Sequence, residues 1–174
     1  MKNIHKLAAI DIGSNAVRLL ITSIRINKSE TKFKKISLVR VPLRLGEDVF
    51  SKGKISDKKL KKLQKTLKAF KILMQMHEVY MFKAVATSAM REAENSTKII
   101  EDIFKKLNIK IDLISGKKEA LMIANVFLNS MENLANNYLY VDVGGGSTEL
   151  NLISKNKIID TKSFKIGTVR TLNN

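Results

Sequence analysis

The amino-acid sequence predicts an α/β fold in which helices lie on both faces of a mixed β-sheet. Two observations predict this class. Three consecutive strand patterns come first, and helical and strand patterns then alternate along the middle of the chain. Three further strand patterns follow the last helical pattern. A run of neighbouring strands followed by alternating helices and strands is typical of a sheet that mixes antiparallel and parallel pairs under covering helices.

The first two strands are predicted to form a hairpin. Leu7–Ile12 and Val17–Ile26 are rich in apolar and β-branched residues, which favour extended structure. Between them, residues 13–15 (Gly-Ser-Asn) are turn formers, and a turn between two such segments indicates a β-hairpin. Lys32–Val41 alternates more weakly between polar and apolar residues and is the third predicted strand.

A long helix is predicted after these strands. The segments 44–48 and 51–54 hold glycine with small or charged residues, which indicates loops. The helix then covers about residues 56 to 77, with Ser56 as the N-cap and Asp57 in the first turn. Its apolar stripe, with members three or four residues apart, consists of Leu60, Leu63, Leu67, Phe70 and Met74.

The rest of the chain alternates between strands and helices before a second hairpin. These predicted elements are strand Val79–Ala86, a helix capped at Asn95 and Ser96, strand Ile109–Ile114, a helix after Gly116, the hairpin strands Tyr138–Val143 and Thr148–Ile153, and a last strand at about Lys157–Phe164. Residues 144–147 (Gly-Gly-Gly-Ser) form the turn of that hairpin. A glycine-containing hairpin therefore stands near each end of the sequence.

Composition excludes several classes of protein. Hydrophobic residues make up 44% and charged residues 28% of the chain, which is typical of a folded globular domain. With no cysteine, the chain holds neither a disulfide nor a thiolate, and its two histidines lack a partner at metal-ligand spacing. No apolar run approaches the roughly 20 residues of a membrane span, and Asp11 comes before any signal-peptide core. We therefore expect a cytoplasmic protein with no membrane partner.

The formal net charge is +16, from 32 basic and 16 acidic residues. Such a charge attracts polyanions: nucleic acid, an acidic membrane surface or a phosphate-rich small molecule. A lysine-rich composition without functional meaning explains the charge equally well. The lysines of residues 56–77 are better explained as the solvated face of an amphipathic helix than as a binding site. Charge alone therefore does not select a function.

One segment of the chain repeats another. Residues 9–19 align without a gap on residues 140–150, and each copy holds an apolar strand, an aspartate, one apolar residue, a turn of small residues and a second strand. Glycines let backbone N–H groups approach phosphate oxygens, and an aspartate beside such a turn can hold a hydrated Mg²⁺. A single turn of this kind is more often an ordinary hairpin. Two turns, with Asp11 and Asp142 in register, favour a site that grips a polyphosphate from two sides.

At these turns the sequence resembles the exopolyphosphatase/guanosine-pentaphosphate phosphohydrolase family. The resemblance rests on four stretches in the same order, namely residues 11–18, 86–93, 114–120 and 142–149. That family belongs to the superfamily of actin, the heat-shock ATPases and the sugar kinases. The resemblance therefore implies an actin-like ATPase (ribonuclease H-like) lobe at residues 1–130, and the beginning of a second, incomplete lobe at residues 131–174.

The resemblance also implies roles for individual residues. Glu119 matches the catalytic carboxylate that activates the attacking water. The acidic positions associated with Mg²⁺ match Asp11, Asp142 and Glu149. The positions that contact phosphate match Ser14, Asn15, Arg18, Arg91, Gly145, Gly146 and Ser147. On local pattern alone Glu119 is better explained as a residue that stabilises a helix N-terminus, so its catalytic assignment rests on the resemblance.

The chain departs from the family pattern in sequence and in length. Lys117 and Lys118 stand where the family often has acidic residues, and we expect them to favour the ionised form of Glu119. Ala16 replaces a frequent serine and removes one hydroxyl. Family members continue beyond this length, so we expect the chain to correspond to the N-terminal portion of such a protein. Either a fragment or a natural truncation would explain this length. We also expect the two turns to face each other across a cleft only when the second lobe is complete.

The leading hypothesis is a Mg²⁺-dependent phosphohydrolase. It would release terminal phosphate from inorganic polyphosphate or guanosine pentaphosphate by in-line attack of water, with Glu119 as general base. The alternative is a non-catalytic sensor that binds polyphosphate or a nucleotide without turnover. A nucleic-acid-binding protein ranks last, because the chain has no tryptophan, three tyrosines and no recognisable reader motif. The oligomeric state, including a homodimer, stays open.

Overall fold

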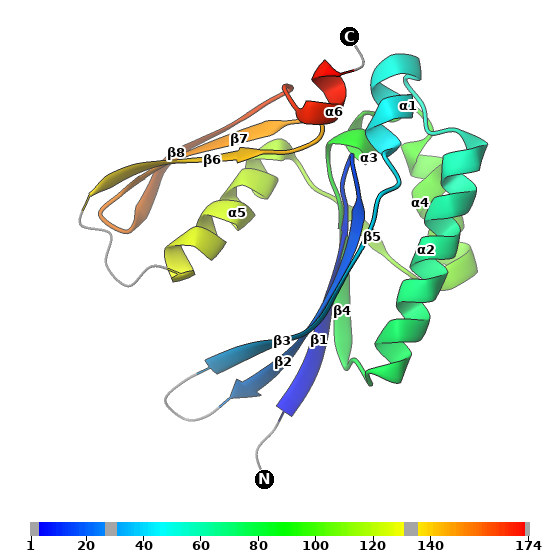
Figure 1. Ribbon diagram of the computed structural model, residues 1–174, viewed down its shortest axis with the longest axis horizontal. Coiled ribbons are helices and arrows are strands. Elements are labelled where there is room, and N and C mark those ends of the chain that lie inside the picture. The colour runs from blue at the N-terminus through cyan, green and yellow to red at the C-terminus, as the bar shows by residue number, and fades with distance from the viewer. Residues whose placement is uncertain (1–3, 27–30, 131–135, 173–174) are drawn as a thin grey trace.

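The computed structural model describes residues 4–26, 31–130 and 136–172, which contain two β-sheets (Figure 1). The larger sheet has five strands in the order β3-β2-β1-β4-β5, and the smaller has three in the order β6-β7-β8. The strands are β1 (Ile4–Ile12), β2 (Val17–Ile26), β3 (Thr31–Val41), β4 (Met81–Ala86), β5 (Ile111–Leu113), β6 (Asn137–Val143), β7 (Thr148–Ser154) and β8 (Lys157–Phe164). The helices are α1 (Leu45–Lys52), α2 (Asp57–Met76), α3 (Ser88–Glu92), α4 (Ser96–Leu107), α5 (Gly116–Ser130) and α6 (Thr168–Thr171). None of these helices is long and apolar enough to cross a membrane.

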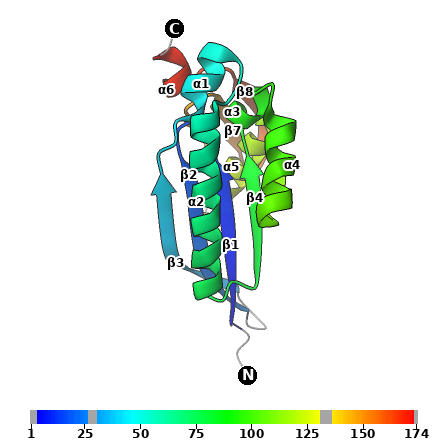
Figure 2. The same cartoon turned by 90° about the vertical axis from the view of Figure 1, so that its right-hand side faces the viewer.

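The five-stranded sheet is mixed, as the sequence predicts. Strand β1 pairs antiparallel with β2 through a tight turn, and it pairs parallel with β4 after a connection that includes α1 and α2. Helices α2 and α4 cover one face of this sheet, while α5 and the smaller sheet lie on its other side (Figures 1 and 2). Because side chains alternate along a strand, Ala8, Ile10 and Ile12 of β1 are buried together, in one core with Leu67 and Phe70 of α2.

Helix α2 begins where the sequence predicts. Ser56 has extended backbone, and its hydroxyl accepts a hydrogen bond from the Lys59 N–H at 3.4 Å, as an N-cap does. The buried apolar residues of the helix are Leu63, Leu67, Phe70 and Met74. The predicted strand at residues 109–114 is shorter in the structure, because it pairs with β4 only over Ile111–Leu113.

Helix α5 packs against the smaller sheet, on strands β7 and β8. A second, small core forms there around Ala124 of the helix and Ile153 of β7. The rings of Phe127 and Tyr140 add to it, with their centroids 4.9 Å apart. The division of the chain at residue 130 stays a prediction. Helix α5 ends at that residue, yet it packs on the sheet that follows it in the sequence.

The loops predicted at residues 44–48 and 51–54 are wrong for most of their length, because helix α1 covers most of this segment. The helix is short and begins beside a glycine, so its local sequence is typical of a turn. Its formation depends on tertiary packing, because Leu45 and Val49 are buried in the main core. Gly53, with a φ of 71°, ends the helix in the left-handed conformation that glycine adopts readily.

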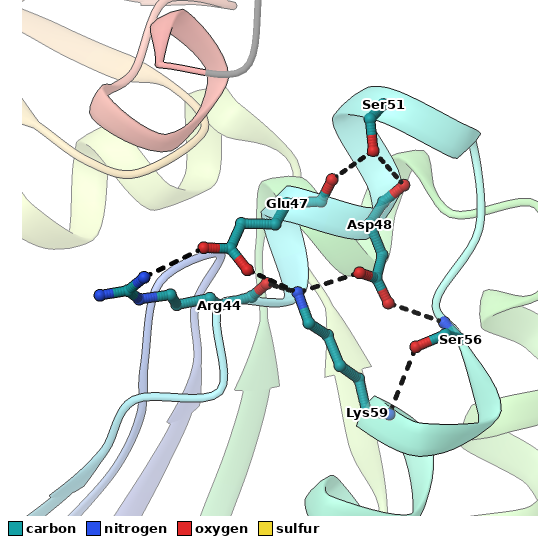
Figure 3. A network of polar contacts seen from close by, with 6 residues as sticks. All are labelled: Arg44, Glu47, Asp48, Ser51, Ser56 and Lys59. Carbon is teal, nitrogen blue, oxygen red and sulfur yellow. Dashed lines mark hydrogen bonds and ion pairs between the residues drawn. The ribbon is translucent and has the colours of Figure 1, made fainter.

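A network of polar side chains joins α1 to α2 (Figure 3). The ammonium of Lys59, on α2, lies 3.0 Å from Glu47 Oε2 and 3.0 Å from Asp48 Oδ1, and it also donates to the carbonyl of Arg44. The Ser56 N–H donates to Asp48 Oδ2 at 3.1 Å. Burial alone would raise the pKa of Asp48, but the hydrogen bonds from Ser56 and Lys59 outweigh it and lower that pKa below its ordinary value. The network therefore fixes α1 to the long helix.

Lys59→Met is expected to lower the free energy of unfolding by about 1–3 kcal/mol, because the partly buried carboxylates of Asp48 and Glu47 lose a charged hydrogen-bond donor. Urea denaturation at pH 7 measures this loss. The exposed Lys61 lies on the same helix, and Lys61→Met is the control, with an expected change of about 0.5 kcal/mol or less. Because the folded-state pKa of Asp48 is lowered, its stabilisation is present above its unfolded pKa and is lost as the pH falls through the folded pKa. Equal losses in the two variants would contradict this account.

Candidate active site

The two glycine-containing turns connect equivalent hairpins. Between β1 and β2, the Gly13 N–H donates to the Ala16 carbonyl at 3.1 Å. Between β6 and β7, the Gly144 N–H donates to the Ser147 carbonyl at 2.9 Å. Both hairpins are antiparallel, so the two predicted hairpins are confirmed. The repeat in the sequence is therefore also a repeat in the structure.

Both turns line one cavity of about 130 Å³. Its walls are formed by Asp11, Gly13, Ser14, Asn15, Ala16, Arg18, Thr87, Ser88, Glu119, Asp142, Val143, Gly144, Gly145 and Ser147. The expectation that the turns face each other only in a complete second lobe is wrong, because a Cβ built on Gly145 would already lie 3.3 Å from the backbone nitrogen of Asn15. Three of the predicted residues, Arg91, Gly146 and Glu149, lie outside the lining.

The first turn is anchored on α3 through a pair of buried hydroxyls. Ser14 Oγ lies 2.6 Å from Ser88 Oγ, and it accepts a hydrogen bond from the Ala89 N–H at 3.1 Å. Thr87 stands beside them in the cavity wall. Sequence reasoning assigned no role to Ser88 or Thr87, although both stand in one of the four family-like stretches, which was the available signal.

The second turn packs against the first half of the chain at Gly146. A Cβ added there would lie 2.3 Å from Ser88 Oγ, 2.7 Å from Ser14 Oγ and 2.5 Å from Phe50 Cζ. Only glycine allows the backbone to approach so closely. Gly146 therefore serves the contact between the two turns, while its neighbour Gly145 lines the cavity.

Glu119 lies in the first turn of α5, and its side chain is 18% exposed. Arg91 Nη1 is 3.5 Å from Glu119 Oε2 and donates to the Ile114 carbonyl at 2.8 Å. Oε2 is buried and accepts no hydrogen bond from any residue that the structure describes. Burial and the charge of Glu149 outweigh the opposing charge of Arg91 and raise the pKa of Glu119 to about 7. A carboxyl group with this pKa in a cavity is suited to accept a proton near neutral pH.

The expectation that Lys117 and Lys118 favour the ionised form of Glu119 is wrong. Both lysines are exposed, so water screens their charges, and the pKa of Glu119 rises instead of falling. The groups that raise it are distant in sequence: Glu149 comes from β7 and Asp11 from β1. The charges of the residues next to Glu119 in the sequence therefore predict the wrong direction for its pKa shift.

Two aspartates face the cavity, one from each hairpin. Asp11 Oδ2 lies 3.2 Å from Arg18 Nη1. Burial raises the pKa of Asp11, Arg18 opposes this effect, and the nearby charge of Asp142 adds to it. Glu149 is 1% exposed and accepts a hydrogen bond from Ser163 Oγ at 2.8 Å. Within residues 4–26, 31–130 and 136–172, no three acidic, histidine or cysteine side chains are grouped as a metal site.

The donor set of the cavity nevertheless suits magnesium. Mg²⁺ in phosphate-transferring proteins usually takes one or two carboxylates, and substrate phosphates and water complete its octahedron. Asp11 and Asp142 line the same cavity and supply such a pair, and the charge of Asp142 already raises the pKa of Asp11. The assignment of Glu149 as a third ligand stays a prediction.

The fold and the site together define the class of protein. It is an actin-like α/β protein with a cavity between two equivalent turns. Solved structures confirm this fold class. The chain matches an exopolyphosphatase from Cytophaga hutchinsonii with a TM-score of 0.87 and 31% identity, over 97% of this chain and 53% of that one. The ethanolamine utilization protein EutJ from Carboxydothermus hydrogenoformans matches with a TM-score of 0.50 over 93% of this chain and 52% of its own. At 15% identity, EutJ shows a shared fold alone.

The chain belongs to the Ppx/GppA phosphatase family, whose model matches residues 24–174. It is 33% identical over 173 residues to a bifunctional 3-dehydroquinate synthase/phosphatase of Fusobacterium nucleatum, which covers 97% of this chain and 26% of that protein. It is 25% identical over 175 residues to exopolyphosphatase 2 of Mycobacterium tuberculosis, which covers 95% of this chain and 53% of that protein. The chain thus spans between a quarter and about half of the length of these curated relatives.

Proposed function

We propose that the protein releases terminal phosphate from inorganic polyphosphate. Family membership and the relatives named exopolyphosphatase support this activity. The observation that carries the proposal is the position of Glu119, a largely buried carboxyl group with a pKa of about 7 in a cavity between two turns. Glu119 lines that cavity, and its Oε2 is buried 3.5 Å from Arg91 Nη1. The chemistry that this arrangement suits is water attack on a bound phosphate.

In the proposed reaction Glu119 accepts a proton from the attacking water. The water oxygen forms a bond to the terminal phosphorus while the bond from phosphorus to the bridging oxygen breaks, and the electron pair leaves with the shortened chain. Backbone N–H groups at Ser14 and Gly145 and the Arg18 guanidinium, all in the cavity wall, bind the phosphate oxygens. Arg91 does not line the cavity and instead orients Glu119 through their 3.5 Å ion pair.

Asp142→Asn is expected to weaken Mg²⁺ affinity by about tenfold or more, because one of the two carboxylates loses its charge. In this proposal Asp11 and Asp142 would hold Mg²⁺, which neutralises phosphate charge. Calorimetric titration with Mg²⁺, alone and with tripolyphosphate, measures the change. Asp160→Asn, at an exposed position of β8, is the matched control with unchanged affinity. Equal Mg²⁺ affinity of Asp142→Asn and the unaltered protein would remove Asp142 from the metal site.

The rate of phosphate release is expected to fall about tenfold per pH unit below pH 7, because only the ionised form of Glu119 accepts a proton. The pKa of Glu119 is raised to about 7, so the base is ionised above that pH and neutral below it. The profile of kcat/KM between pH 5 and 9 measures this dependence, because that ratio reports the pKa of the free enzyme. A rate that stays constant from pH 5 to 7 would contradict the role of Glu119 as the base.

A second substrate, guanosine pentaphosphate, is supported by a larger cavity of about 370 Å³ beside the first. The two cavities share Asp11, Arg18, Thr87, Glu119 and Asp142. The further walls of the larger one are mostly apolar and include Ala9, Ile10, Val85, Ile114, Met122 and Ile123. An apolar wall beside bound phosphates can bury a nucleoside, because ligand pockets are typically apolar with a few polar groups.

Phosphate release tests the proposed function. The protein expressed from its complete reading frame is incubated with Mg²⁺ and with polyphosphate or guanosine pentaphosphate in parallel. The proposal predicts release from polyphosphate, and release from the pentaphosphate would extend it to the second substrate. Tight binding of polyphosphate without release would instead establish the sensor. Salt-sensitive nucleic-acid binding that exceeds polyphosphate binding would favour the nucleic-acid partner. A cytoplasmic location and a homodimer stay predictions.

A further inference from the structure

The side chain of Arg170 joins the second turn to the first half of the molecule. Arg170 belongs to α6, and its side chain is 18% exposed. Nε donates to the Gly146 carbonyl at 2.9 Å, and Nη2 donates to Glu92 Oε1 at 2.7 Å. The guanidinium carbon lies 4.0 Å from the centroid of the Phe50 ring. One planar group therefore contacts the turn, α3 and α1, and α1, α3 and α6 gather at one end of the molecule (Figure 1).

Helix α3 carries the partner of Arg170 next to the partner of Glu119. Arg91 contacts Glu119 at 3.5 Å and the Ile114 carbonyl at 2.8 Å. Glu92, the next residue, accepts the 2.7 Å hydrogen bond from Arg170. The two side chains leave one five-residue helix, so a shift of that helix moves both contacts together. The chain of contacts links the second turn to the carboxylate of Glu119.

We infer that Arg170 is a positioning residue that keeps residues 145–147 in register with Glu119. The inference rests on the proposed function, in which the turn binds phosphate and Glu119 activates water. Arginine suits this place because its guanidinium presents several donors in one plane and a flat face to an aromatic ring. The compact ammonium of lysine cannot donate to Gly146 and Glu92 and also stack on Phe50.

If Arg170 had a purely structural role, its side chain would serve only to hold α6 on the second turn. That helix has further attachments to the second turn: the Thr168 N–H donates to the Gly144 carbonyl at 3.0 Å, and the Val169 N–H donates to the Gly145 carbonyl at 2.8 Å. Loss of the Arg170 side chain therefore leaves α6 on the turn and removes contacts to the first half. The effect to measure is consequently on catalysis in folded protein, and not on folding alone.

Steady-state hydrolysis of polyphosphate by Arg170→Met, Arg170→Lys and Glu92→Gln tests the inference. Arg170→Met is expected to lower kcat by about 10²-fold with less than a tenfold change in KM, because a misplacement of about 1 Å at the reacting groups costs that much. Arg170→Lys and Glu92→Gln should lie between Arg170→Met and the unaltered protein. The control is Lys165→Met: Lys165 Nζ lies 3.8 Å from Glu92 Oε2, but its side chain is 77% exposed. The kcat of this control should stay within about twofold of that of the unaltered protein.

Three results would overturn the inference. The first is a kcat of folded Arg170→Met within about twofold of the unaltered protein, against the larger loss expected. The second is an effect confined to KM. The third concerns the double variant. Arg170 and Glu92 are the two ends of one contact, so removing both should lower kcat no further than removing one. A kcat loss in the double variant equal to the product of the two single losses would contradict this. Circular dichroism at the assay temperature identifies the folded variants, and Glu92→Gln, which keeps the side-chain shape, serves if Arg170→Met does not fold.

Hydrogen exchange separates this inference from the proposed function. If the unaltered protein releases no phosphate, the proposed function fails, and the amides of residues 145–147 then report on positioning without catalysis. Their exchange should become faster in Arg170→Met and Glu92→Gln and stay unchanged in Lys165→Met. Unchanged exchange in all three variants would overturn the positioning role whatever the activity.

Discussion

Glu119→Gln is expected to lower the rate of phosphate release by about 10²- to 10⁴-fold, the usual contribution of a positioned general base. The amide keeps the shape of the side chain and cannot accept the proton of the attacking water. Binding of polyphosphate should persist, because the turns at Ser14 and Gly145 and the guanidinium of Arg18 are untouched. The change should therefore appear in kcat and leave the dissociation constant of polyphosphate nearly the same.

Single-turnover phosphate release and equilibrium binding of polyphosphate measure the two quantities separately. Glu101→Gln, at an exposed position of α4, is the matched control and should have the rate of the unaltered protein. A Glu119→Gln protein within about twofold of that rate would show that another group activates the water. A loss of binding equal to the loss of rate would also contradict the account, because it would assign Glu119 to substrate binding.

Gly146→Ala is expected to lower the rate of phosphate release by about 10²-fold, the effect of displacing a binding group by about 1 Å. A Cβ at this position would lie 2.3 Å from Ser88 Oγ and 2.7 Å from Ser14 Oγ, so either the second turn or this buried pair of hydroxyls must shift. The overpacking should also lower the free energy of unfolding by about 1–3 kcal/mol.

Gly145→Ala gives a graded comparison at the neighbouring position. Its Cβ would lie 3.2 Å from Val169 Cγ2 and 3.3 Å from Asn15 Cβ, which requires only a small adjustment. Urea denaturation and phosphate release of both variants test the difference. Unchanged stability and rate in Gly146→Ala would show that the turns do not touch as the structure describes. A larger effect in Gly145→Ala would show that Gly146 is not the position of tightest contact.

The elements that the sequence predicts well are those with a long local pattern. The stripe of α2 repeats over about four turns, and the two hairpins combine β-branched strands with glycine-containing turns. The short helices α1, α3 and α6 have no such pattern. Helix α1 forms because Leu45 and Val49 are buried against distant residues, and that burial is not visible in a local window.

Some features of the candidate site could likewise be predicted from the sequence, and others could not. The internal repeat places Asp11 and Asp142 in equivalent turns, and the structure brings both to one cavity. The pKa of Glu119 depends on its burial and on a carboxylate from another strand, and the neighbouring lysines predict the opposite sign. Arg170 lies outside every stretch that carries the family resemblance. Its contacts with Glu92 and Phe50 join residues far apart in the chain, so only the fold reveals them.

The central claim is that one polyphosphate lies between the two turns with its terminal phosphate at Glu119. A crystal structure of the Glu119→Gln protein with Mg²⁺ and tripolyphosphate tests it most directly, because this variant should bind without turnover. The account predicts phosphate oxygens in contact with backbone N–H groups of residues 13–16 and of residues 144–147, and the terminal phosphate beside position 119. Tripolyphosphate held by one turn alone, or on the lysine face of α2 with the cavity empty, would contradict it.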